Sequence, residues 1–170
     1  MQKKQKRCRR LIYQFLGILL ITIFSIDSYA DFSGSVTATT DYIWRGYSKS
    51  DRKPALQANI DYEFKSGAYL GVFASTVDFK DSEFRDPSKI EFKPYAGFAY
   101  QLADDWRFNV EWTRYIFSGK IFGQNVDYNE FYLYGHFRDL LTVNLGFSEN
   151  GYQQNHISFN SEISGRYQIA

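Results

Sequence analysis

The chain has 170 residues, with 20 lysines and arginines against 19 aspartates and glutamates, and it contains 16 phenylalanines, 14 tyrosines and 3 tryptophans. This length suits one domain. The near-neutral charge argues against nucleic acid as a partner, and the single cysteine, Cys8, excludes an internal disulfide.

The N-terminus has the three-part plan of a secretory signal peptide. Six lysines and arginines, with no acid, lie within residues 3–10, and the apolar run that follows is densest over residues 16–24. The small residues Ser28 and Ala30 then occupy the −3 and −1 positions of a cleavage site between Ala30 and Asp31. This pattern predicts export from the cytoplasm.

The alternative for this segment is a permanent membrane anchor. A spanning helix needs about 20 apolar residues, whereas this run is interrupted by Gln14 and ends at Asp27. We therefore predict a signal peptide over residues 1–30 and an exported domain over residues 31–170. Removal of the leader also removes Cys8, and with it any thiolate metal site or cysteine nucleophile.

The exported domain is acidic and rich in aromatic residues. The leader holds six of the bases and one of the acids, which leaves 14 bases against 18 acids, a net charge of −4. Of the 140 remaining residues, 29 are aromatic. Tyr and Trp are enriched where a membrane meets water, because a flat apolar ring carries one polar group. No basic patch remains that would bind nucleic acid.

Apolar and polar residues alternate with a period of two over most of the exported domain, which predicts β-strands rather than helices. The clearest segment sets Leu56, Ile60 and Phe64 on one face against Asp61 and Glu63 on the other. Most segments are near the ~9–11 residues that a tilted membrane strand needs. The predicted strands cover roughly residues 32–47, 56–64, 69–79, 90–102, 106–117, 128–137, 141–147 and 157–169.

The connections between these strands alternate between long and short. The long ones are residues 49–54, 80–88, 118–126 and 148–155, and the tight turns are Ser66-Gly67, Ala103-Asp104 and Arg138-Asp139. Bacterial outer-membrane barrels have an even number of antiparallel strands, short periplasmic turns and longer outer loops. The pattern therefore predicts an all-β, antiparallel up-and-down transmembrane β-barrel of about eight strands.

Alternation alone does not say which face points inward. In a soluble exported barrel or sandwich, the apolar face would be buried and the polar face would meet water. We favour the reverse, in which Leu56, Ile60, Phe98 and Leu145 face lipid and polar residues such as Asp61 and Glu111 face the interior. Tyrosines and tryptophans near strand ends on the apolar face support this orientation: Tyr42, Trp44, Tyr69, Tyr100 and Trp106.

Charges of both signs lie on the predicted polar faces, as an interior ion-pair network requires. The candidate lumen or constriction charges are Asp41, Arg45, Asp61, Glu63, Glu91, Lys93, Arg107, Glu111, Glu162 and Arg166. Asp41 and Arg45 fall on one predicted strand, where a rise of ~3.3 Å per residue separates them by about 13 Å. The functional interpretation is a charged constriction that sets ion preference. The structural alternative, which we prefer, is a network that holds the interior together.

Catalytic and metal-binding patterns are weak, and we predict no enzyme, no cofactor and no metal site. The only histidines, His136 and His156, fall at opposite rims of the predicted barrel, and the nucleophile motif Gly-x-Ser-x-Gly is absent. Asp81, Glu83 and Asp86 lack the spacing of a calcium loop. We interpret them as a solvated acidic loop.

Residues 36–79 carry a distinctive set of short motifs. These are Thr40-Asp41-Tyr42, Arg45-Gly46, Ser48, Ser50, Asp51, Pro54-Ala55-Leu56-Gln57, Asp61-Tyr62, Ser66-Gly67 and Val77-Asp78-Phe79. Weaker matches continue at Glu91, Tyr95-Ala96-Gly97, Asp127-Tyr128 and Glu130. Together they resemble the TorF-type porin family of proteobacteria, also called Gcw_chp, over about residues 32–147. The resemblance implies an outer-membrane barrel with a pore role, and it brings no catalytic residues.

The chain differs from that family near residues 167–170, where members usually continue through further hairpins to a final aromatic residue. Two alternatives stay open: a compact eight-strand variant, or a chain cut short. An eight-strand barrel is just wide enough to be filled by side chains, whereas a wide porin lumen needs ~16 strands. Any passage would therefore admit only ions or small polar solutes.

Three functions follow from these expectations. The first is a small channel in the outer membrane of a Gram-negative bacterium, surrounded by lipid and lipopolysaccharide. The second is a structural barrel whose long loops contact partners at the surface, without transport. The third is a soluble periplasmic ligand-binding barrel. The sequence leaves the transported solute and the oligomeric state open.

Overall fold

The computed structural model describes residues 31–138, 140–151 and 156–167. The predicted signal peptide and the Ala30 side of its cleavage site lie outside these residues, as does Asp139 of one predicted turn. No helix in the described ranges is long and apolar enough to cross a membrane.

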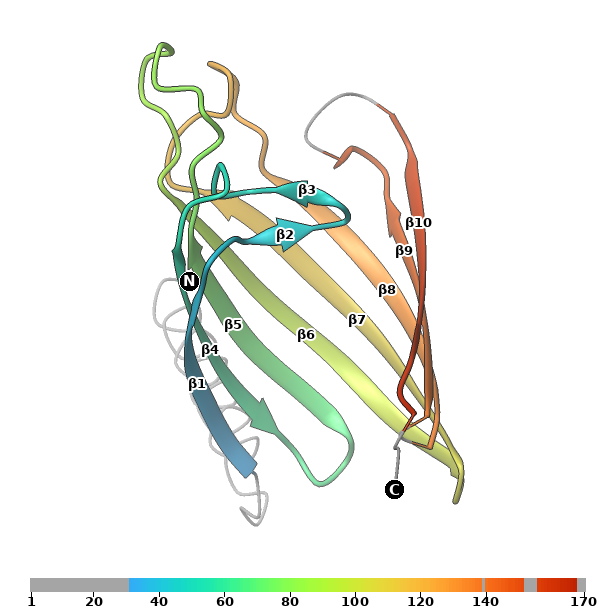
Figure 1. Cartoon of the computed structure of the whole chain (residues 1–170). Helices are drawn as coiled ribbons and strands as arrows, with labels where there is room; N and C mark the ends of the chain where they lie inside the picture. Colours follow the sequence, from blue (N-terminus) through green and yellow to red (C-terminus); the bar gives the residue numbers. More distant parts are fainter. Residues whose placement is uncertain (1–30, 139, 152–155, 168–170) are drawn as a thin grey trace, which may run out of the picture.

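Eight antiparallel strands form one sheet in the order β1-β4-β5-β6-β7-β8-β9-β10 (Figure 1). They are β1 (Asp31–Thr39), β4 (Ala55–Glu63), β5 (Ala68–Thr76), β6 (Ile90–Ala103), β7 (Trp106–Phe117), β8 (Tyr128–Phe137), β9 (Leu141–Ser148) and β10 (Ser158–Gly165). Each strand pairs with the next sheet strand along the chain, so the predicted all-β, up-and-down arrangement is confirmed. The strands predicted over residues 106–117 and 128–137 have the predicted bounds.

The sheet curves around a concave side, but it is not a closed barrel in the described residues. No pairing joins β1 to β10 there, so both strands are sheet edges. Figure 1 shows them on opposite sides of the curved sheet. The predicted closed barrel is therefore present only as its eight-stranded wall.

Long and short connections fall at opposite ends of the sheet, as predicted (Figure 1). The short connections are residues 64–67, 104–105 and 138–140, and the longer ones between sheet strands are residues 40–54, 77–89, 118–127 and 149–157. Gly67 requires glycine, because its φ is +87° and a Cβ there would clash with the Ala99 carbonyl oxygen. The period-two pattern of the strands and the residues of the tight turns together account for the alternation of long and short connections.

The predicted strand over residues 32–47 is wrong at its C-terminal part. The sheet strand ends at Thr39, and residues beyond it form a separate hairpin of β2 (Ile43–Trp44) and β3 (Tyr47–Ser48) that lies across the concave side (Figure 1). Arg45 and Gly46 connect these short strands with φ values of 49° and 84°. Two consecutive positive φ values are typical of a tight hairpin turn. Asp41 and Arg45 therefore do not share a strand.

The orientation of the two faces agrees with the predicted one. The four apolar residues predicted to face outward are 42–57% exposed on the convex side: Leu56, Ile60, Phe98 and Leu145. Asp61 and Glu111 lie on the concave side, where Tyr95 and Tyr69 donate hydrogen bonds to them. The sheet therefore has an apolar outer face and a polar inner one.

Three of the five rim aromatics were assigned to the wrong face. Tyr100 and Trp106 are exposed on the convex side, as predicted. Tyr42 is buried, Trp44 packs against the buried cluster, and the Tyr69 hydroxyl reaches a concave-side carboxylate. The first two belong to the segment that folds inward, which local alternation does not reveal.

The buried core lies beneath the hairpin, at the long-loop end of the concave side. Tyr115, Phe117, Ile121, Val126 and Tyr128 form one cluster, against which Trp44 and Phe79 pack. A second cluster consists of Tyr42, Ala55 and Val77. The hairpin is thus held by apolar contact, which also excludes water from the charged groups beside it.

Candidate functional site

The candidate site is a cluster of charged and aromatic side chains between the hairpin and the sheet. Lys49, just after β3, places its Nζ 2.5 Å from Glu91 Oε1 on β6, and both side chains are fully buried. The Tyr42 hydroxyl donates to the other oxygen of Glu91 at 2.8 Å. Burial strengthens this pair and makes each partner costly to remove.

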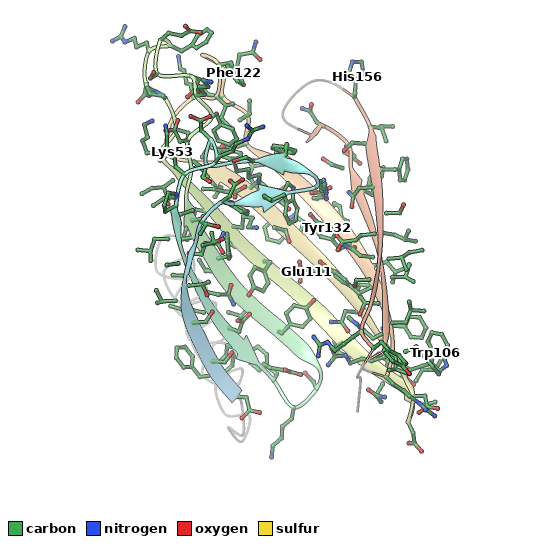
Figure 2. The ribbon with its side chains drawn as sticks, in the orientation of Figure 1. Lys53, Trp106, Glu111, Phe122, Tyr132 and His156 are labelled. Atoms are coloured by element: carbon green, nitrogen blue, oxygen red, sulfur yellow. The ribbon has the colours of Figure 1, made fainter. Side chains whose placement is uncertain are left out.

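A second ion pair joins the turn of the hairpin to β8. Arg45 Nη2 lies 2.7 Å from Glu130 Oε1, and the Glu130 side chain is fully buried. Asn160 on β10 donates to Glu130 Oε1 at 2.8 Å, and the Tyr132 hydroxyl donates to Oε2 at 2.6 Å. Glu130 therefore connects three parts of the chain that are distant in sequence. Figure 2 shows Tyr132 on the concave side beside the hairpin.

Three cations surround the ring of Trp44. Arg45 lies 4.9 Å from the ring centroid, Lys49 lies 5.1 Å and Lys93 lies 4.8 Å. Cations at such distances are attracted to the negative face of the indole. Arg45 and Lys49 each have a carboxylate partner, and within the described residues Lys93 has none within 4.0 Å.

The concave side continues toward the tight-turn end as a hydrogen-bonded polar surface. Glu111 accepts from Tyr69 at 3.0 Å and from Thr113 at 2.9 Å. Asp61 accepts short hydrogen bonds from Asn59 and Tyr95. Glu111 projects into the concave side in Figure 2. These carboxylates are held by neutral donors rather than by cations.

The ten predicted charges thus divide into separate groups. Arg45, Glu91 and Lys93 meet at the hairpin, whereas Asp41 is held within its own loop by the Ser48 and Ser50 hydroxyls at 2.5 and 2.9 Å. Asp61 and Glu111 lie farther along the concave side. The other four predicted charges are exposed: Glu63, Arg107, Glu162 and Arg166.

Two central residues, Lys49 and Glu130, were not predicted as site residues. Lys49 falls after the last alternating residue of its segment, so it was assigned to a loop. Glu130 lies on the same strand face as Tyr128 and Tyr132. This position is the one sequence feature that indicates a concave-side carboxylate here. Its partner Arg45 is 85 residues away, and no local pattern indicates the pairing.

Comparison with protein families gives one match. A family model described as "Bacterial protein of unknown function (Gcw_chp)" matches residues 25–165. The chain belongs to the Gcw_chp family. The resemblance found in the sequence is confirmed, and the family description assigns no function. Searches of curated proteins and of solved structures found no match.

The histidines of this Gcw_chp protein lie at opposite ends of the sheet. His156 is at the long-loop end in Figure 2. His136 pairs in register with Arg107 near the tight turns, where both line an open cavity of about 550 Å³ together with Arg166. No group of three or more potential metal ligands occurs within the described ranges. The histidines therefore cannot act together.

The loop predicted to be a solvated acidic segment is only partly so. Asp81 is fully buried, and its Oδ2 accepts a hydrogen bond of 3.0 Å from the Phe122 backbone N–H. This contact joins the 77–89 loop to the 118–127 loop. Glu83 and Asp86 are exposed, as predicted. The Asp81 carboxylate of this Gcw_chp chain thus holds the two loops together.

Exposed ion pairs occur at both ends of the sheet. At the long-loop end, Lys53 Nζ lies 2.8 Å from Asp78 Oδ2, and this hydrogen bond is the main cause that lowers the pKa of Asp78. At the tight-turn end, Arg138 Nε lies 2.8 Å from Asp105 Oδ1, and its hydrogen bond likewise lowers the pKa of Asp105. Exposed pairs of this kind contribute little to stability.

Proposed function

We propose that this Gcw_chp protein is an outer-membrane β-barrel of a Gram-negative bacterium that admits ions or small polar solutes to a narrow interior. The observation that carries this proposal is the apolar convex face. Every strand of the sheet exposes large apolar side chains there, among them Phe32, Ile60, Leu70, Phe98, Val110, Leu133, Leu145 and Ile163.

A face of this extent is unusual for a protein surrounded by water. Soluble monomers rarely expose continuous apolar patches larger than about a few hundred Å², whereas a membrane barrel requires an apolar band on its outside. Lipid and lipopolysaccharide are therefore the proposed surroundings of the convex face. The same observation argues against the soluble periplasmic alternative.

Barrel closure is itself part of the proposal. The edges of β1 and β10 carry backbone N–H and C=O groups that lack a strand partner in the described residues. In hydrocarbon each unpaired group would cost several kcal/mol, so open sheet edges do not occur in contact with lipid. Insertion therefore requires both edges to be paired.

The proposed passage is narrow because the hairpin occupies part of the concave side. The hairpin is held there by the Lys49–Glu91 and Arg45–Glu130 ion pairs. Eight strands enclose little more than their own side chains. The charged and hydroxyl groups that remain suit ions and small polar solutes rather than large molecules.

A matched pair of substitutions tests the membrane assignment. Val110 on β7 is exposed on the convex side, and its neighbour Asn109 faces the concave side. We expect Val110→Arg to reduce insertion into lipid vesicles, because arginine on the lipid face costs about 2–4 kcal/mol near the bilayer midplane, while Asn109→Arg inserts normally. Vesicle flotation measures both. Equal insertion of the two variants, or purification without detergent, would contradict the proposal.

Transport is tested separately in planar bilayers. We expect the folded full chain to give discrete conductance steps. Inserted protein without such steps would remove the channel and favour the surface-interaction alternative. One observation supports that second candidate: Phe84 and Phe122 are exposed on the long loops, with ring centroids 5.9 Å apart. Figure 2 shows Phe122 at that end of the molecule.

A further inference from the structure

A cavity of about 360 Å³ lies between the hairpin segment and strands β4 to β6. Its lining includes Asp41, Tyr42, Trp44, Gln57, Phe73 and Lys93. Lys93 comes from the sheet, and Trp44 comes from the hairpin, so the cavity exists only because the hairpin folds inward. Its walls combine aromatic rings with a few polar groups, which is typical of small-molecule sites.

Lys93 has too few partners for an ammonium group in this setting. Its Nζ lies 4.0 Å from the Phe73 ring centroid and 4.8 Å from that of Trp44. It donates one hydrogen bond, of 3.3 Å, to the Tyr42 hydroxyl. Lys93 is half-buried, an ammonium has three donors, and a cation partly removed from water is stabilised by a counter-charge. Aromatic rings supply only part of that compensation.

The surroundings of Trp44 show the same imbalance. Three cations lie near its ring, and two of them, Arg45 and Lys49, are paired with Glu130 and Glu91. The Trp44 Nε1–H is buried and has no acceptor in the described structure. Asp41 also lines the cavity, but the Ser48 and Ser50 hydroxyls bond its carboxylate. Within the described residues, the Lys93 ammonium therefore has one hydrogen-bond acceptor and the Trp44 Nε1–H has none.

We propose that this cavity binds a short-chain monocarboxylate, whose oxygen accepts from Lys93 Nζ while its hydrocarbon end contacts the Phe73 ring. The site deepens the proposed function and rests on it, since the ligand must reach the concave side from water. A carboxylate fits because its oxygen can accept from the Lys93 donors that the described residues leave unused. The aromatic walls favour a carboxylate with an apolar end over a simple halide.

The test uses Trp44 as a reporter in the folded full chain in detergent micelles. The chain has 3 tryptophans, and Trp106→Phe with Trp112→Phe leaves Trp44 alone while preserving aromatic residues on the convex face. Sodium propionate is titrated against sodium chloride at constant ionic strength. We expect a saturable change in Trp44 emission with propionate and none with chloride.

Lys93→Met removes the charge and keeps the length of the side chain. We expect it to weaken propionate binding about tenfold or more, as loss of a charged hydrogen bond implies, while Lys93→Arg retains binding. The matched control is Lys65→Met on the exposed β4–β5 turn, which should bind as the parent does. Unchanged affinity in a folded Lys93→Met variant, or identical responses to propionate and chloride, would overturn the site.

Line broadening of carbon-13 propionate provides a second measurement that needs neither tryptophan nor the Met variant. We expect the parent chain to broaden the carbon-13 signal of propionate, and we expect excess unlabelled propionate, but not chloride, to reverse this broadening. The absence of reversible broadening would overturn the site. Failure of the site and failure of the channel are distinguishable. Conductance without propionate binding would remove only the carboxylate site, and binding without conductance would remove only transport.

Discussion

The two ends of the concave side hold their charges in different ways. At the long-loop end, the hairpin covers the sheet and charges are buried as ion pairs, such as Lys49 with Glu91. At the tight-turn end, no described segment crosses the sheet, and Arg107 and Arg166 are exposed around an open cavity. The difference shows that the hairpin, rather than the sheet, excludes water from the charged groups. In that environment the loss of a single charge costs more stability than it does at an exposed site.

The largest effect should come from removing one member of the most buried pair. We expect Glu91→Gln to lower the free energy of unfolding by about 3–5 kcal/mol, because it leaves the Lys49 ammonium buried without a carboxylate. Urea unfolding in detergent measures it. Glu63→Gln, at the exposed end of β4, is the control and should stay within about 0.5 kcal/mol. Equal destabilisation by both variants would remove the distinction between the two ends.

A smaller effect is expected for the pair at the hairpin turn. Arg45 is 30% exposed, so solvent compensates part of its loss. We expect Arg45→Met to cost about 1.5–3 kcal/mol, the range of a hydrogen bond to a charged group. A double-mutant cycle with Glu130→Gln isolates the coupling. Additive losses would show that the two side chains do not interact.

Acid should affect the exposed ion pairs least. The pKa of Asp78 is lowered from 3.8, so its contribution to stability is complete above pH 3.8 and is lost as the pH falls through the lower value of the folded state. We expect Lys53→Met to reduce this acid dependence and to lower the stability at pH 7 by the same small amount. Unfolding curves between pH 2 and pH 7 measure it, and an unaltered acid transition would contradict the assignment.

Strand positions were predictable because they depend on local alternation. The segment 106–117 alternates from Trp106 to Thr113, and the structure gives β7 the predicted bounds. The hairpin was not predictable by the same rule. Tyr42 and Trp44 continue the alternation of β1, and only the Arg45-Gly46 dipeptide signals the reversal. The alternating pattern therefore predicts a strand that continues past Thr39, where contacts with the concave side turn the chain into the hairpin.

The candidate site could be predicted only in part, because ion pairs between distant segments leave no local pattern. Glu91 and Lys93 were identified from their strand face. Lys49 and Glu130 were not, since their roles depend on where the hairpin docks. Local patterns also cannot test barrel closure, because it would require β1 to pair with β10, and these two strands are the opposite edges of the sheet.

The sequence separations of the hairpin contacts have a consequence for assembly. Lys49 is 42 residues from Glu91, and Arg45 is 85 residues from Glu130. Contacts between such distant residues form slowly, since the intervening chain must first be ordered. Docking of the hairpin is therefore expected as a late kinetic step, after β8 has joined the sheet. Until then the concave side of the sheet would be wetter than it is in the finished protein.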